Sequence, residues 1–296
     1  MAAAGKWRCF RAVLQARAPI HIGWHELGLI QRTRYYIPAR AMWGLLVAGL
    51  TPRLKSGPEL QYEATARDLE DCLRFTCFFP ATDPSDDSQL FRPKYVEKRG
   101  ITYGELTAAE FESRLVYSQT SAALEPMQLS ALDGALHESE FLSPVDPKEK
   151  KGVHFVGYLV IHESLDTKLV EDTLRHCCAG ADRHYGWGDL QLRGKLRDAG
   201  GGPVFETLRY AGGCEFMAPS GGPHYLPAHL ACDGAESGFE GALEAVSGRD
   251  WCKTDGPGRA SQPRAELCWA PGTRVANEGT DIRFEIGAKG LWTRVG

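Results

Sequence analysis

A glycine-rich tract between positions 179 and 190 holds the residues of this chain that are best suited to chemistry. Gly180, Gly186 and Gly188 surround Arg183 and His184 within it. Glycine reaches positive φ without a side-chain clash and lets another backbone approach closely. Successive N–H groups in such a turn form a concavity that binds anions. The tract therefore predicts a contact with a negatively charged chain such as a nucleic-acid backbone, and a plain turn between two elements is the alternative.

A second group of functional side chains lies between positions 20 and 40. Its members are His21, Trp24, Arg32, Arg34, Tyr35 and Arg40. Arginines just before a helix can pair with phosphates, because the helix N-terminus also attracts negative charge. Trp24 falls in a predicted loop and is a candidate to stack on an unpaired base. Together the two groups predict a shared cradle for a ribose-phosphate strand.

Two histidines leave a catalytic alternative open. His21 and His25 could act as general acid and base in a metal-independent ribonuclease, together with Tyr35 or His184. The apolar neighbours of His21 favour a structural or RNA-contacting role instead. The sequence has no Ser-His-Asp arrangement, no H-E-x-x-H motif and no phosphate-binding P-loop. We therefore assign no catalytic residue, no metal ligand and no cofactor.

Charge is distributed unevenly along the 296 residues, although the net charge is only −4 at pH 7. Residues 1–55 are strongly basic, whereas residues 59–149 are rich in acids. The asymmetry predicts a basic face for a polyanion and an acidic face for another partner, and random clustering of solvated charges explains it equally well. The chain lacks an N-terminal signal sequence and any apolar run long enough to span a membrane. These features predict a cytoplasmic protein without a membrane partner.

Hydrophobic periodicity predicts the elements that position these residues. Strands are expected over 7–22, 113–122, 137–142, 153–162 and 189–192, and helices over 39–50, 59–77 and 166–178. Thr51 and Pro52 are expected to end the first helix, and Asp166 to cap the last. Residues 80–104 are expected to form a projecting hairpin, within an inserted loop of about 80–112. The order strand, helix, strands, helix, strand predicts an α+β fold of the RRM or ferredoxin type.

The run of glycines at 200–202 before Pro203 is the best linker candidate. It divides the chain into an RRM-like domain over residues 1–199 and a smaller part over 203–296. The second part is rich in glycine, proline and tryptophan, a composition typical of short strands and loops. The sequence therefore predicts a β-rich C-terminal subdomain.

Three segments, taken in order, resemble the RAMP superfamily, the repeat-associated RRM-fold proteins that build CRISPR effector complexes. Residues 18–23 and 36–44 are similar to the "hIG…yIPGSSLkG" segment of that superfamily. Residues 123–140 and 152–157 are similar to its "L-x-x-x-E…G-x-x-F-x-G" segment. Residues 180–188 are similar to its C-terminal glycine-rich loop. The chain departs from the pattern at positions 39–41, where Ala-Arg-Ala replaces Gly-Ser-Ser.

The resemblance implies a non-catalytic RNA-binding subunit of a type III effector ribonucleoprotein in antiviral defence. Residues 33–44 look most like subunits that cap the 5′ handle of the guide RNA, including the III-D kind. The implied partners are the CRISPR guide RNA, a large signalling subunit and backbone RAMP subunits, with target RNA reached indirectly. The residues expected to bind RNA are His21, Trp24, Arg32, Arg34, Tyr35, Arg40, Gly180, Arg183, His184, Gly186 and Gly188.

Three other functions stay open at this point. The first is a metal-independent endoribonuclease that matures guide RNA through His21 and His25. The second is a backbone RAMP subunit that cuts target RNA with a carboxylate at Asp83, Asp86 or Asp87. The third is an RRM-like interaction module that binds no RNA.

Overall fold

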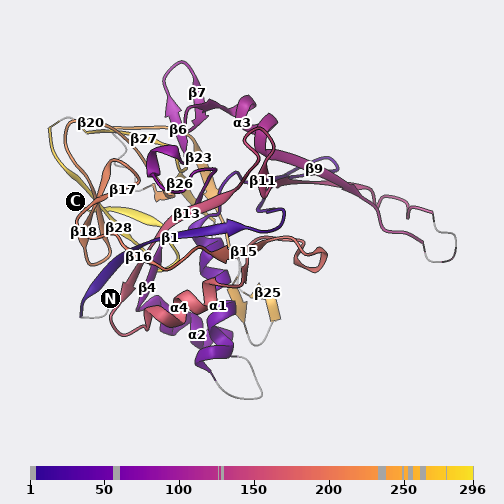
Figure 1. The fold of residues 1–296 in the computed structure, drawn as a ribbon, viewed down its shortest axis with the longest axis horizontal. Coiled ribbons are helices and arrows are strands. Elements are labelled where there is room, and N and C mark those ends of the chain that lie inside the picture. Colours follow the sequence, from indigo (N-terminus) through magenta and orange to yellow (C-terminus); the bar gives the residue numbers. More distant parts are fainter. Residues whose placement is uncertain are drawn as a thin grey trace.

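A central antiparallel sheet organises the computed structural model, which describes residues 5–55, 61–125, 127, 130–232, 238–248, 250–252, 256–260, 265–277 and 279–295. The strands follow the order β14-β15-β1-β13-β4, and β16 and β5 add to β1 and β13 (Figure 1). Their bounds are Cys177–Cys178 (β14), Asp189–Leu192 (β15), Trp7–Ala16 (β1), His154–His162 (β13), Leu73–Phe75 (β4), Arg197–Asp198 (β16) and Phe79–Ala81 (β5).

The helices complete a ferredoxin-like arrangement. They are α1 (Ala39–Leu54), α2 (Tyr62–Glu70) and α4 (Thr167–Leu174). The chain order is β1-α1-β4-β13-α4-β15, and the spatial order β15-β1-β13-β4 is that of the split βαβ fold. The predicted α+β fold is therefore confirmed. No helix in the described ranges is long and apolar enough to cross a membrane.

Local sequence rules account for the elements of the sheet and for the start of α4. Phe10, Ala12, Leu14 and Ala16 are buried on β1, whereas the intervening side chains are half-buried, as the period of two in a strand predicts. Asp166 caps α4, because its carboxylate accepts a hydrogen bond from Lys168 N at 2.9 Å.

Two elements end elsewhere than the sequence predicts. β1 ends at Ala16 and does not reach residue 22, since Pro19 has no N–H to offer a strand ladder. α1 continues through Pro52 to Leu54. Pro52 has no N–H, so it removes the helical hydrogen bond to the carbonyl of Ala48, four residues earlier. The helix tolerates this loss because Ala48 is exposed to water.

Three further predictions of secondary structure are wrong in part. The expected helix over 59–77 ends at Glu70, and the apolar residues after it form β4 at the edge of the central sheet. The expected helix over 166–178 ends at Leu174, because Cys177–Cys178 pairs with β15. Residues 113–115 belong to α3 (Ala108–Leu115), which begins at a capping box of Thr107 and Glu110. Tertiary pairing overrides local propensity in the first two cases.

The longest projection is a β-hairpin arm formed by β9 (Val116–Ser121), β10 (His137–Leu142) and the segment between them (Figure 1). β3 (Ile30–Thr33) pairs in parallel with β10, and β2 (Gly23–Leu27) pairs with β3. The predicted hairpin in residues 80–104 exists as a shorter projection. Its elements are β6 (Pro93–Val96), β7 (Gly100–Tyr103) and β8 (Leu106–Thr107), which form a three-stranded sheet. A separate two-stranded sheet pairs β11 (Val145–Asp146) with β12 (Lys151–Gly152).

The C-terminal residues form short strands around an eight-stranded sheet in the order β17-β18-β19-β28-β29-β21-β26-β23. These strands are Pro203–Val204, Leu208–Gly212, Glu215–Ala218, Ile282–Ile286, Trp292–Val295, Leu230–Ala231, Glu266–Trp269 and Leu243–Val246. Beside it lie β20 (Gly222–Tyr225), β27 (Arg274–Asn277), β22 (Phe239–Glu240), β24 (Asp250–Cys252) and β25 (Gly256–Ala260). One hydrophobic core runs through both parts of the chain. The division at about residue 200 stays a prediction.

Asp87 ties the central sheet to the C-terminal part. It lies in a short 3₁₀ helix, η1 (Asp87–Gln89), and its side chain is 10% exposed. Its carboxylate accepts hydrogen bonds from Arg11 Nε at 2.8 Å, Tyr158 Oη at 2.5 Å and Phe205 N at 2.9 Å. Burial, together with the Asp87 charge, raises the pKa of Tyr158. This carboxylate therefore has a structural role.

We expect Asp87→Ala to lower the free energy of unfolding by about 3 kcal/mol, because a half-buried guanidinium and two further donors lose their acceptor. Asp86→Ala is the matched control, since Asp86 is an exposed cap of η1 and its loss costs about 1 kcal/mol or less. Urea unfolding measures both. Equal losses in the two variants would contradict the role of Asp87.

Candidate nucleic-acid interface

The glycine tract lies beside residues 19–22, at the start of the second predicted segment. Ala181 N donates to His21 O at 3.0 Å, and Gly188 N donates to Pro19 O at 2.8 Å. The arm begins at the same place, because Ile20 and Leu142 exchange backbone hydrogen bonds of 3.1 and 2.9 Å. The glycine tract, residues 19–22 and the root of the arm thus form one junction.

Two of the glycines in the tract allow this close approach. Gly180 has φ +88° and Gly188 has φ +85°. A Cβ atom on Gly180 would overlap the carbonyl oxygen of His21, and one on Gly188 would overlap that of Ala179. Gly186 also has positive φ, at +84°, but open space surrounds it. Gly180 and Gly188 therefore serve packing, and a direct contact of any of the three with RNA stays a prediction.

Most amides of this turn already donate within the protein. Tyr185 N donates to Asp182 O at 2.9 Å and Gly186 N to Arg183 O at 3.0 Å, in addition to the amides that hold the junction. The turn contains a second 3₁₀ helix, η2 (Arg183–Tyr185), entered from Asp182 at φ +58°. Few backbone N–H groups of this turn are left to bind an anion. The side chains at the surface of the turn are therefore the better candidates for contact with RNA.

His21 is a buried part of the junction. The residue is 3% exposed, and Nδ1 lies 2.5 Å from the carbonyl oxygen of Glu140 on β10. That geometry makes Nδ1 a donor to a backbone acceptor, which orients the ring and joins residues 19–22 to the arm. A buried ring in this position supports the structural interpretation of His21 over an acid–base one.

Arg32 and Tyr35 belong to a polar cluster at the root of the arm. Arg32 Nε donates to Glu140 Oε2 at 2.8 Å, and its Nη2 donates to Tyr35 Oη at 2.8 Å. Tyr35 Oη in turn donates to Glu112 Oε1 at 2.8 Å. Burial and that hydrogen bond raise the pKa of Tyr35. Tyr35 is only 5% exposed and packs on Phe111, so its ring is part of the core.

Arg34 bridges this edge to the C-terminal part. Its Nη1 donates to Glu244 Oε1 at 2.9 Å and to Tyr36 Oη at 3.2 Å, and His229 Nε2 contacts the same carboxylate. Burial alone would raise the pKa of Glu244, but His229 and Arg34 lower it to about 2. The charge of Arg34 is therefore paired within the protein, and its side chain is only 16% exposed.

The remaining predicted residues differ in accessibility. Trp24 on β2 is 43% exposed, and its ring lies tilted against the ring of His25 with centroids 4.3 Å apart. The Arg34 guanidinium lies 5.9 Å from the centre of the Trp24 ring. Arg40, at the start of α1, is half-buried next to Gly248 of the C-terminal part.

An exposed surface crosses the glycine tract and the root of the arm. Arg183, His184 and Tyr185 are exposed, and the rings of the last two lie 4.0 Å apart. Trp187 packs on Phe141 of β10 at 5.0 Å, and Phe141 stacks on its cross-strand partner Tyr117 at 6.3 Å. We call Trp24, Arg183, His184, Tyr185, Trp187, Phe141 and Tyr117 the aromatic rim.

Sequence reasoning selected only part of this rim. It named Trp24, Arg183 and His184, but it missed Tyr117, Phe141, Tyr185 and Trp187 as functional candidates. The available signal was aromatic residues on the predicted strands at 113–122 and 137–142, which a hairpin pairing would place opposite each other.

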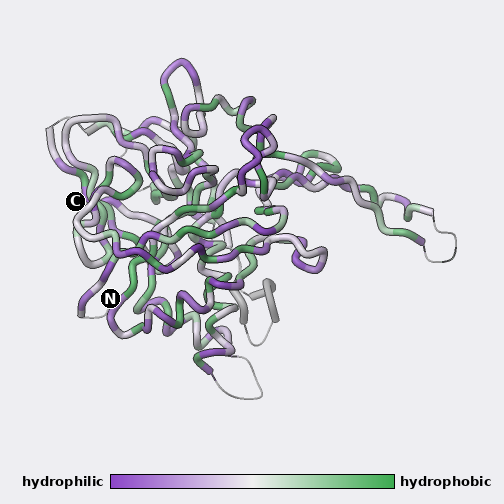
Figure 2. Tube along the Cα trace, viewed as in Figure 1, coloured by the Kyte–Doolittle hydropathy of each residue, from purple (hydrophilic) through white to green (hydrophobic). Residues whose placement is uncertain are grey.

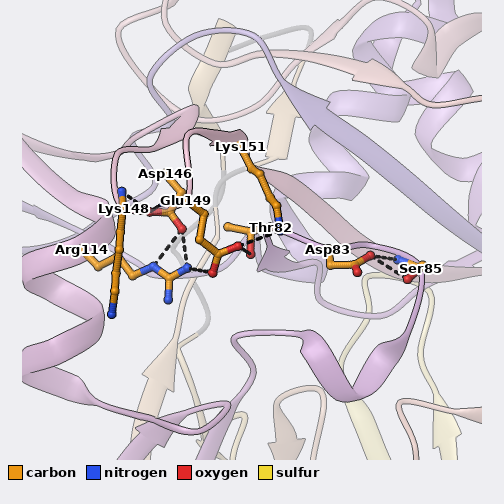
Figure 3. A network of polar contacts seen from close by, with 8 residues as sticks. All are labelled: Thr82, Asp83, Ser85, Arg114, Asp146, Lys148, Glu149 and Lys151. Carbon is orange, nitrogen blue, oxygen red and sulfur yellow. Dashed lines mark hydrogen bonds and ion pairs between the residues drawn. The ribbon is translucent and has the colours of Figure 1, made fainter.

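The carboxylates before the short hairpin are engaged in turns and ion pairs. Asp83 accepts hydrogen bonds from Ser85 N at 3.0 Å and Ser85 Oγ at 2.6 Å (Figure 3). Beside it, Arg114 pairs with Asp146 and Glu149 (Figure 3). Within the described ranges no group of three His, Cys, Asp or Glu side chains is placed to hold a metal ion.

Comparisons with family models and with curated proteins give no match. The fold, in contrast, is similar to chains of solved structures. One belongs to the cryo-electron-microscopy structure of type III-B Cmr-beta bound to cognate target RNA and AMPPnP. The TM-score is 0.55 at 9% identity, over 90% of this chain and 85% of that chain. A chain of type III-B Cmr-beta bound to cognate target RNA gives 0.54 at 10% identity, over 90% and 86%. At such identities the likeness is one of fold.

Gly180→Ala tests the junction. The new Cβ would meet the His21 carbonyl at a positive φ, so we expect a loss of about 3 kcal/mol in unfolding free energy. Gly186→Ala has the same backbone strain but no neighbour within 4 Å, and about 1 kcal/mol is expected. Chemical unfolding of the two variants gives the difference. The junction would be disproved by a Gly186 variant as unstable as the Gly180 variant.

Glu244→Gln should destabilise the protein at pH 7 by about 2 kcal/mol. The folded pKa of Glu244 is about 2, below the ordinary 4.5. Its contribution is therefore complete above pH 4.5 and is lost as the pH falls toward 2. The gap in unfolding free energy between parent and variant should shrink over that range. A gap that stays constant with pH would exclude the ion-pair role.

Proposed function

We propose that this chain is an RNA-binding subunit of a type III CRISPR effector ribonucleoprotein. The observation that carries the proposal is the fold shared over 90% of its length with chains of type III-B Cmr-beta bound to target RNA. The segments that resemble RAMP proteins, residues 18–23 and 180–188, meet at one junction of that fold. A family resemblance in sequence order and a matching tertiary arrangement support the same assignment.

The aromatic rim is the surface we assign to RNA. Exposed Arg183 supplies a charge for a phosphate, although its Nε also donates to Gly180 O at 2.9 Å. Trp24 and Tyr185, 43% and 68% exposed, offer ring faces to unpaired bases. RNA readers typically combine these two kinds of contact on single-stranded segments.

The other predicted residues make internal hydrogen bonds or are only partly exposed. His21 orders the junction, Tyr35 is held at the root of the arm, and Arg34 bridges to the C-terminal part, each through internal hydrogen bonds. Arg32 keeps 31% of its side chain exposed, and with half-buried Arg40 it stays a candidate for direct phosphate contact. The internal ion pairs of Arg32 and Arg34 make us assign most of the RNA affinity to the rim and less to these two arginines.

The finer role proposed is that of a non-catalytic cap on the 5′ handle of the guide RNA. It is supported by the resemblance of residues 33–44 to capping subunits. Large signalling and backbone RAMP subunits are the proposed neighbours, with target RNA reached indirectly. His21 is buried, and the ring of His25 packs against the ring of Trp24. The observations therefore favour binding over guide cleavage by this histidine pair.

Arg183→Ala combined with His184→Ala should weaken guide-RNA binding several-fold, because the rim loses a phosphate contact and a ring. The slope of log affinity against log salt should fall by about 0.7 for the lost contact with single-stranded RNA. Filter binding at a series of salt concentrations measures both. Arg175→Ala removes an exposed arginine that caps the C-terminus of α4 and pairs with Asp172, and it should change neither. Identical curves for all three proteins would refute the assigned surface.

The RNA that accompanies the chain from its native cells distinguishes the finer roles. A cap protects one 5′ end and is present in one copy, whereas a backbone subunit is present in several. Purified protein without any discrete RNA would contradict the proposal as a whole.

A further inference from the structure

The side of the central sheet that faces away from the helices carries polar side chains. Trp43 of α1 packs on Phe75, and strand register places Phe75 on the same side of the sheet as Phe10. Alternate residues of a strand point to opposite faces, so Gln15 and Arg17 lie on the other side, away from the helices. Figure 2 shows hydrophilic positions among the apolar ones where β1 and β15 cross the body.

Strand register sets the neighbours of these two side chains. Gln15 is in register with Gln191 on β15 and with His154 on β13, and all three are half-buried. Arg17 N donates to Asp189 O at 2.9 Å, and Arg17 Nη1 donates to Gln191 Oε1 at 3.1 Å. The exposed end of this surface thus begins at Arg17.

Two further arginines lie on the same side, farther along β1. Arg193 N donates to Val13 O at 2.8 Å, and Arg197 on β16 is in register with Arg11. Burial and the charge of Arg193 lower the pKa of His154, as expected for a cation on the same face. Side chains of directly paired residues share a face of the sheet. We give the name open face to Gln15, Arg17, His154, Gln191, Arg193 and Arg197.

The three arginines of the open face differ from those that join distant segments. Arg17, Arg193 and Arg197 are exposed, and within the described ranges none of them has a carboxylate oxygen within 4.0 Å. The other two arginines of β1 are each paired with a carboxylate. The charges of the open face are therefore available to an anion from outside the chain.

Few carboxylates offset these charges. Asp189, in register with Arg17, and Asp83 lie on this side of the sheet. Asp87 lies there too, but it is ion-paired. Lys195 is exposed in the connection between β15 and β16 and adds a cation beside the open face. The other nearby carboxylates have partners, Glu149 with Arg114 and Lys151, Asp198 with Arg8, and Glu171 of α4 with Leu196 N.

The open face continues from the glycine tract. Asp189, which is in register with Arg17, directly follows Gly188, and Gly188 N donates to Pro19 O at 2.8 Å. β15 and β16 lie along β1 and lead away from the tract (Figure 1). The distance from Arg17 to the row of Arg197 is about 20 Å at the usual rise of a strand. A chain bound at the aromatic rim therefore meets further cations when it continues along β1.

Two features favour RNA over an acidic protein segment on the open face. Gln15, Gln191 and His154 lie between the cations, and their amide and imidazole groups suit the 2′-hydroxyls and base edges of RNA. The surface also adjoins the aromatic rim, which we assign to RNA. An acidic protein segment would account for the arginines but not for the position next to the rim.

We propose that the open face binds the same RNA strand as the aromatic rim, with Arg17, Arg193 and Arg197 in contact with its phosphates. The inference rests on the proposed function and adds a path for the RNA to it. The strand passes the glycine tract and then crosses the sheet along β1 toward the C-terminal part. Because the contacts are ionic, they weaken as the salt concentration rises.

Removal of the three charges measures what the open face contributes. Arg17→Ala, Arg193→Ala and Arg197→Ala are combined in the full-length protein, and the probe is a single-stranded oligouridylate of about 16 nucleotides. Affinity at moderate salt should fall about tenfold, and the slope of log affinity against log salt should fall by about 2, since each contact contributes about 0.7. The melting temperature should stay the same, because all three side chains are exposed.

The matched control removes three exposed arginines from the helical side of the sheet, Arg8→Ala, Arg53→Ala and Arg175→Ala. It changes the net charge equally and should leave the affinity and the slope as in the parent. An open-face variant that binds like the parent, or a control that loses as much affinity, overturns the inference. A parent protein that binds no oligouridylate contradicts the proposed function instead.

Photocrosslinking in the intact complex locates the RNA. p-Azido-L-phenylalanine is introduced at Gln191 in one full-length protein and at Tyr185 in another, and each complex is purified from native cells and irradiated. We expect adducts with the same RNA at both positions. If Tyr185 reacts with RNA while Gln191 reacts with an acidic protein segment or with nothing, the inference is overturned. An RNA adduct at Gln191 alone overturns the shared path, and no RNA adduct at either position contradicts the proposed function itself.

Discussion

The close approach of two backbones at the junction is the constraint on which the rest of this structure depends. The turn at Gly180 can touch the carbonyl of His21 only because no Cβ stands between them. The same short segment then pairs through Ile20 with the last residue of β10. One edge of the ferredoxin-like sheet, the root of the arm and the glycine turn are thereby held in one place. A surface assembled from three distant segments needs such an anchor, since loops alone hold their side chains less precisely.

Ion pairs in this protein join segments that are distant in sequence. Several of the N-terminal arginines that look like a basic face in the sequence meet a carboxylate from far along the chain. Arg34 reaches Glu244, Arg32 reaches Glu140, and Arg11 reaches Asp87. Truncating one partner of such a part-buried pair is costly, because the other charge stays behind without compensation. Arg183, which is exposed beside the rings of the glycine tract, is one cation that stays accessible to a polyanion.

The sequence was most informative where one physical signal dominated. The segment 189–192 predicted β15 to the residue, and burial alternates along it because one face of the strand is apolar. The strand-like segment 137–142 likewise matches both bounds of β10. The carboxylate of Asp166 marked the start of α4 for a similarly local reason. The predictions were wrong where burial outweighed local preference. The apolar run that follows Glu70 suits a helix as well as a strand, and the open edge of the central sheet selected the strand.

By itself the sequence determined the order of the elements, the need for glycine at a left-handed turn and the candidate status of the arginine and histidine residues. It could not determine which of those residues face solvent. Glu140 lies 108 positions from Arg32, and Glu244 lies 210 positions from Arg34, so no local pattern joins them. Only the tertiary structure decided that His21 is buried and that Phe141 packs on Trp187. It also decided that Arg32 and Arg34 form ion pairs within the protein. Pairing at such separations is set by how the sheets pack, because packing brings distant side chains within reach of each other.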